Sequence, residues 1–239
     1  MIQRILVPVD FGNASASAVS LGGRLASACE ATLTLLHAEA FEAPVYFTAD
    51  QVEALAAERK ARQQQAERYL QMFGQAHTTT AFTPLIAMRT PVDAIAEEAR
   101  PADLVVIGTH GRRGPQVWWL GSVAERVLRD LTSPVLVVHA GDAPHGGITS
   151  IAVHAAPGLS GTNALALAMR IGQAMDAEVH DRRRVPADPS VMFDDVQMVA
   201  VAEPWVHDRR WRTHVGEPLI RTGRGPVLFV PERAEDEDR

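Results

Sequence analysis

Ile5-Leu6-Val7-Pro8-Val9-Asp10 is a continuous apolar run that ends in a carboxylate. Such a run is typical of a strand buried on both faces of a parallel sheet. Residues 12–15 follow as a loop with helix-capping side chains, and apolar residues then recur at steps of three and four, which predicts a helix to about residue 29. Residues 32–38 read as the second strand. Parallel strands need a crossover helix between them, so this order predicts a βαβ unit.

The alternation of strands and helices continues to residue 138. A capping box at residues 48–51 predicts a long helix to about residue 73, and Thr90-Pro91 predicts the start of a short helix over 92–100. Another capping-box spacing predicts a helix from Ser122. The remaining strands are expected at residues 79–86, where Pro84 interrupts the pattern, and at 103–108 and 134–138. The fold class is therefore α/β, with a doubly wound parallel sheet.

The pattern starts again after a turn-rich linker at residues 141–147. Strands expected at residues 148–153, 196–202 and 225–230, with a helix over 162–175, repeat the first unit in a shorter form. Little sequence between residues 186 and 194 remains for a long helix and a third strand. We expect a domain at 1–141, a shortened domain at 148–232 and an acidic, disordered tail at 233–239.

Composition narrows the classes of function. The 239 residues carry a net charge of −6 without a basic stripe, which argues against a nucleic-acid partner. The single cysteine, Cys29, excludes an internal disulfide and fits a reducing cytoplasm, where we expect an inert buried thiol. The N-terminal residues read as neither a secretion signal nor a membrane span, so no membrane partner is expected.

The candidate site lies where the strands end. In open parallel sheets, ligands bind beyond the carboxyl ends of the strands, the edge that collects Asp10, Ala38 and Gly108. Three glycines in residues 108–114 let backbone N–H groups approach an anion, and Gly121-Ser122 opens a helix whose N-terminus favours phosphate. His110, Arg112 and Arg113 lie inside this segment. Taken alone, each piece is also explained by an ordinary turn, and Asp10 by a helix cap.

Gly108-Thr109-His110-Gly111, nine further residues and then Gly121-Ser122 resemble the nucleotide-binding signature of the universal stress protein family. Residues 5–10 resemble that family's first strand, and residues 35–38 its second. The resemblance implies two Rossmann-like units of the adenine nucleotide alpha hydrolase type, the second one truncated. It also implies a site for ATP or another adenine nucleotide, with or without Mg²⁺, formed by Pro8, Val9, Asp10, Ala38, Ile107, Gly108, His110, Gly111, Arg112, Gly121, Ser122, Val123 and Ala124.

Within that resemblance, Asp10 and the Ala38 backbone are expected to contact adenosine, and the glycines and Ser122 the ribose and phosphates. Ala124 stands where the family often has a hydroxyl residue. The second unit departs from the pattern, because Ala156 replaces Asp10 and Glu217-Pro218 replace the second glycine turn. We expect no nucleotide there.

The function expected is a nucleotide-binding stress-response protein and not an enzyme, with slow ATP hydrolysis or a ligand-free interaction module as alternatives. No catalytic residue and no metal site is expected, and we interpret His207 and His214 as solvated. Trp118 and Trp119 are expected to pack under the loop or against the second unit. The units are expected to pair through residues 134–138 and 226–230 as an intramolecular pseudo-dimer, with a homodimer left open.

Overall fold

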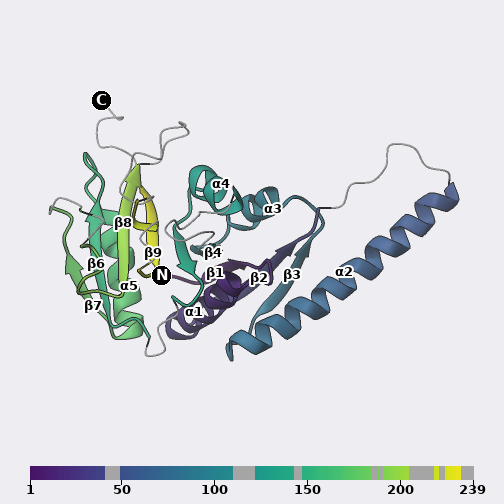
Figure 1. Cartoon of the computed structure of the whole chain (residues 1–239), viewed down its shortest axis with the longest axis horizontal. Helices are drawn as coiled ribbons and strands as arrows, with labels where there is room; N and C mark the ends of the chain where they lie inside the picture. Colours follow the sequence, from purple (N-terminus) through teal and green to yellow (C-terminus); the bar gives the residue numbers. More distant parts are fainter. Residues whose placement is uncertain are drawn as a thin grey trace, which may run out of the picture.

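A computed structural model of the chain describes residues 1–40, 49–109, 122–142, 147–184, 188, 191–204, 218–220 and 224–232, with side chains from residue 55 onward in the second of these ranges. Within them, strands and helices alternate along the first half of the chain (Figure 1). This half holds β1 (Arg4–Pro8), α1 (Asn13–Cys29), β2 (Thr32–Ala38), α2 (Ala49–His77), β3 (Thr83–Ala87), α3 (Pro91–Glu98), β4 (Leu104–Thr109), α4 (Ser122–Asp130) and β5 (Val135–His139). The second half holds β6 (Ser150–Ala155), α5 (Thr162–Met175), β7 (Glu178–Asp181), β8 (Met198–Pro204) and β9 (Val227–Glu232).

The strands of the described residues form one nine-stranded sheet in the order β3-β2-β1-β4-β5-β9-β8-β6-β7. All neighbours are parallel except β5 and β9, which run antiparallel with Val135 opposite Phe229 and Val137 opposite Val227. This pairing of the two last strands is the one predicted from the sequence, and it is confirmed. The α/β fold with doubly wound parallel strands is confirmed as well.

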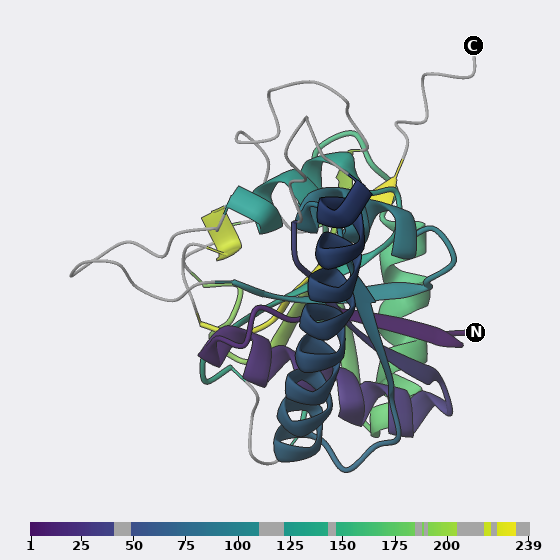
Figure 2. The same cartoon turned by 90° about the vertical axis from the view of Figure 1, so that its right-hand side faces the viewer.

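Helices cover both faces of the sheet, as buried-strand sequences require. One hydrophobic cluster lies between the sheet and α1, α2 and α5, and it contains Leu25, Leu70 and Ile171. The other lies on the face of α3 and α4, which stand together in both views (Figures 1 and 2), and it contains Ile95 and Val127. On this second face the shorter half is covered in part by Met192, Phe193 and Val196 and by the helical turn at 218–220.

Several element boundaries differ from the sequence-based predictions. Helix α1 begins at Asn13, so residues 13–15, which were expected in a loop, belong to the helix, and its N-cap is Gly12. Strand β3 begins at Thr83 and not at residue 79, and α2 continues to His77. Strand β7 was not predicted at all. Helix α3 agrees closely, because Thr90 accepts a hydrogen bond from the Asp93 N–H at 3.3 Å and Pro91 occupies the first turn.

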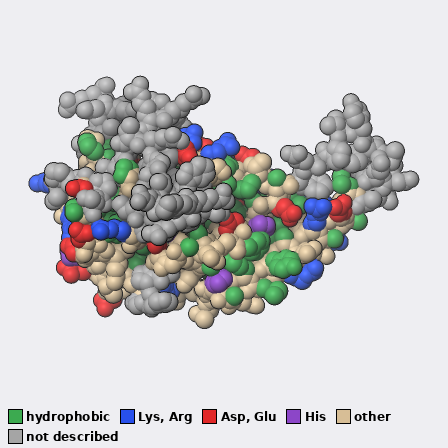
Figure 3. All heavy atoms as spheres, in the orientation of Figure 1, with side chains coloured by type: hydrophobic (Ala, Val, Ile, Leu, Met, Phe, Trp, Pro, Cys, Tyr) green, Lys and Arg blue, Asp and Glu red, His purple; other side chains and the backbone are tan. Residues whose placement is uncertain are grey.

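Helix α2 runs past β3 and out beyond the edge of the sheet (Figure 1). Its C-terminal part packs on the core through Leu70 and Phe73, whereas every side chain from residue 56 to 65 is exposed. Figure 3 shows exposed hydrophobic side chains along the part of α2 that lies against the body. Tyr69 and Met72 of α2 are both exposed. None of the helices in the described residues is long and apolar enough to cross a membrane.

Candidate nucleotide site

A cavity opens at the carboxyl ends of β1, β2 and β4, beside the start of α4. It measures about 170 Å³, whereas one water needs roughly 10–15 Å³, so it accommodates a small organic group. Nine residues predicted from the sequence line it: Pro8, Val9, Asp10, Ala38, Ile107, Gly108, Ser122, Val123 and Ala124. The other four predicted residues, His110, Gly111, Arg112 and Gly121, lie outside the described residues, as do Trp118, Trp119, His207 and His214.

Five lining residues were not predicted: Ser15, Leu36, His37, Pro91 and Ile95. Leu36 was within reach of sequence reasoning, because it precedes Ala38 by two positions and therefore shares its face of β2. Pro91 and Ile95 come from α3, whose placement over this edge depends on long-range packing. Ser15 was assigned to a loop, and only the helical geometry of α1 turns it toward Asp10.

The Asp10 carboxylate is fixed by the start of α1. Its Oδ1 accepts hydrogen bonds from the Gly12 N–H at 2.9 Å and from Ser15 Oγ at 2.6 Å, while Ser15 Oγ accepts the Asp10 N–H at 3.1 Å. Asp10 therefore helps to satisfy the helix start without being its N-cap residue, which is Gly12. The prediction of a simple helix cap is therefore wrong, whereas the predicted contact of Asp10 with a nucleotide stays a prediction for a residue that lines the cavity.

The ends of β1 and β4 approach α1 closely. A Cβ atom on Gly108 would lie only 2.5 to 2.7 Å from the backbone of Ala14 and Ser15, so only glycine fits at this strand end. Phe11 adopts a left-handed backbone with φ of 62°, and its ring lies 4.5 Å from that of His37 and 5.5 Å from that of Phe73. His37 donates from Nδ1 to the Val9 carbonyl at 2.8 Å, because a carbonyl can only accept. These contacts tie the loop after β1 to α2.

The cavity combines three kinds of surface. Its walls are mostly apolar, with Leu36 and Ile107 on strands, Val9 directly after β1 and Ile95 on α3. The Asp10 carboxylate also lines it. The third surface is the first turn of α4, where backbone N–H groups lack partners within the helix and the helix dipole favours an anion. A flat apolar ring with polar substituents and an attached anion matches this arrangement.

The second half carries different side chains at the same places. Strand β6 pairs with β8 as β1 pairs with β4, so that Ala152, opposite Val199, corresponds to Leu6, opposite Val105. In this register His154 corresponds to Pro8 and Ala156 to Asp10. By the same count Arg182 replaces the cavity residue Leu36. Arg182 forms an ion pair with Asp195, and the hydrogen bond with this arginine lowers the pKa of Asp195. Polar and charged groups thus replace the apolar walls of the cavity.

Other candidate groups lie away from this site. Cys29 is half buried near the end of α1, and burial raises the pKa of its thiol, as expected for an unreactive cysteine. Within the described ranges, no group of three or more His, Cys, Asp or Glu residues is arranged to hold a metal ion.

Comparison with known proteins shows the family to which the chain belongs. The model of the Universal stress protein family matches residues 1–139, and the chain belongs to that family. A universal stress protein of Mycolicibacterium smegmatis is 50% identical over 48 residues, and one of Methanocaldococcus jannaschii is 50% identical over 50 residues. These matches span 20% of this chain in both cases, and only 16% and 29% of the relatives' own lengths.

The likeness in fold extends over both halves. The crystal structure of a universal stress protein from Archaeoglobus fulgidus covers 95% of this chain and 98% of its own, with a TM-score of 0.65 and 14% identity. At that identity the likeness concerns the fold alone.

Proposed function

We propose that the first half binds an adenine nucleotide, ATP or a related compound, in the cavity between β1, β2, β4 and α4. The observation that carries this proposal is the convergence of nine sequence-predicted residues on one cavity of the described structure. The base and ribose lie against Val9, Leu36 and Ile107, near Asp10 and the backbone of Ala38. The phosphates lie toward the first turn of α4, where N–H donors and the helix dipole favour negative charge.

Binding without fast turnover fits the composition of the cavity. Asp10 is the one acid among the described lining residues, and its Oδ1 is already engaged by Gly12 and Ser15. Mg²⁺ commonly binds through one or two carboxylates together with the phosphates of a nucleotide, so Asp10 suits an ion that enters with ATP. The protein then acts as a regulator, because a nucleotide stabilises whichever conformation or assembly binds it better.

A steric variant tests the site. Ala38 lines the cavity and is only half buried, so Ala38→Phe fills the cavity from the end of β2 without a large cost to the core. We expect this variant to lose at least tenfold in ATP affinity by titration calorimetry. Ala57→Phe, on the exposed part of α2, is the matched control and should bind as the wild type does. Equal affinity of both variants would exclude this cavity as the nucleotide site.

A further inference from the structure

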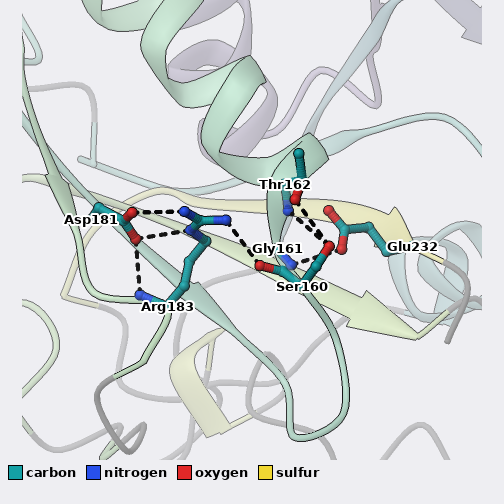
Figure 4. Close-up of polar contacts among 6 residues, drawn as sticks. All are labelled: Ser160, Gly161, Thr162, Asp181, Arg183 and Glu232. Carbon is teal, nitrogen blue, oxygen red and sulfur yellow. Dashed lines mark hydrogen bonds and ion pairs between the residues drawn. The ribbon is translucent and has the colours of Figure 1, made fainter. Parts of the chain in front are cut away.

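The last residue of β9 contacts the start of α5. Glu232 is only 5% exposed, and its carboxylate accepts three backbone N–H groups. Oε2 accepts the N–H of Gly161 at 2.9 Å, and Oε1 accepts those of Asn163 and Ala164 at 2.7 and 3.3 Å. Figure 4 shows the carboxylate directed at this loop from the end of the strand. The first N–H groups of a helix have no partner within it, so Glu232 holds the position of a bound anion.

The first half satisfies its equivalent helix differently. Gly12 precedes α1 as Gly161 precedes α5, and its N–H donates to Asp10 Oδ1 at the same distance of 2.9 Å. In the second half Ala156 stands at the position of Asp10, and its side chain has no carboxylate. The carboxylate comes instead from the last strand, about 70 residues further along the chain.

An arginine holds the other side of the same loop. Arg183 donates from Nη1 to the Ser160 carbonyl at 3.0 Å and forms two hydrogen bonds with the Asp181 carboxylate, at 2.9 and 2.8 Å. The pKa of Arg183 is raised chiefly by Asp181 and also by the negative charge of Glu232. Gly161 lies between them with φ of 65°, and a Cβ there would approach Arg183 Cδ to 2.7 Å. The loop of Ser160 and Gly161 is therefore held both by Arg183 and by the Glu232 carboxylate.

Strand β9 is also the strand that joins the two halves. It pairs with β8 on one side and with β5 of the first half on the other. We propose that Glu232 is an internal latch, in which its carboxylate takes over the contact that Asp10 makes in the first half, fastens β9 to α5 and so keeps β9 in place at the join. This inference is independent of the proposed nucleotide site, because none of its residues lines that cavity.

Hydrogen–deuterium exchange of the full-length protein tests the latch. In Glu232→Ala, the amides of Gly161, Asn163 and Ala164 should exchange at least tenfold faster than in the wild type, and those of β9 should also exchange faster. Amides of β1 and β2 should be unchanged. Added formate, a small carboxylate, should restore protection of the three loop amides. Glu178→Ala is the matched control, because this acid on β7 is 76% exposed, and its exchange should equal that of the wild type.

Wild-type exchange of the three amides in folded Glu232→Ala would overturn the proposal, and so would a loss of protection that formate does not restore. Should Glu232→Ala fail to fold, Glu232→Gln keeps the volume and one carbonyl acceptor. It should then show a smaller acceleration at the same three amides, and unchanged exchange in that variant would equally overturn the latch.

Discussion

His154 has the position in the second half that Pro8 has in the first, and its surroundings are poorly suited to a charged ring. The side chain is 3% exposed, and neither ring nitrogen has a hydrogen-bond partner among the described residues. Burial, with a smaller contribution from Arg182, lowers its pKa from 6.5 to about 4. The ring is therefore neutral in the folded protein at pH 7.

This environment predicts how stability depends on pH. Below about pH 6.5 the unfolded chain takes up a proton at His154, whereas the folded protein does so only near pH 4. The buried, neutral His154 therefore does not reduce the free energy of unfolding above about pH 6.5. That free energy decreases as the pH falls from 6.5 toward 4, because only the unfolded chain binds the proton. His154→Val should reduce the acid-induced fall in unfolding free energy over this range by roughly 2–3 kcal/mol.

Urea unfolding at pH 7, 5.5 and 4.5 measures that difference. His180→Gln is the matched control, because His180 on β7 is 31% exposed, and it should follow the wild type. If the His154→Val and wild-type curves ran parallel from pH 7 to 4.5, His154 would not be the group responsible.

The roles of single residues could be predicted from the sequence only in part. Asp10, Ala38 and Gly108 could be predicted because each stands at the end of a recognisable strand, and strand ends meet at one edge of a parallel sheet. Glu232 could not, because its partners lie about 70 residues away and the sequence around it reads as the beginning of an acidic tail. Ser15 was missed because its contact with Asp10 exists only once α1 begins at Asn13.

Among the elements, the predictions failed where local pattern and tertiary packing disagree. Strands β1, β2 and β5 are apolar enough to be read directly. Strand β7 has four residues, three of them charged or polar, and its pairing with β6 alone makes it a strand. Helix α2 extends four residues past its predicted end, because Phe73 and Gly74 pack on the sheet beside Phe82 and Leu35. Residues 110–121, which carry most of the predicted loop, lie outside the described structure.

Strand β5 gives a prediction at this scale. All five of its residues are buried, and its outer edge is covered by β9. Removing residues 147–239 exposes that edge, and an unpaired apolar edge strand promotes association. The fragment should dimerise or aggregate in light scattering, whereas the full chain supplies the same contact within itself. A fragment that stays monomeric at high concentration would show that β9 is not needed to cover β5.

At the scale of the whole molecule, the strands of two unequal halves form one continuous sheet. In the described residues, the first half contributes five parallel strands and the cavity, and the second contributes four strands, a charged edge and the Glu232 latch. In the described residues, the second half has no strand that corresponds to β3. It also has no counterparts there of α2 and α3, the helices that flank β3 in the first half. In this account the second half contributes its last strand and its packed face, and not a second nucleotide site.

Titration calorimetry of the full-length protein with ATP tests that account most directly. One nucleotide should bind per chain, since Ala156 and Arg182 replace Asp10 and the apolar wall residue Leu36 in the second half. The same titration of Ala38→Phe should lose this single site. A stoichiometry near two, or no binding of any adenine nucleotide by the wild type, would contradict the account.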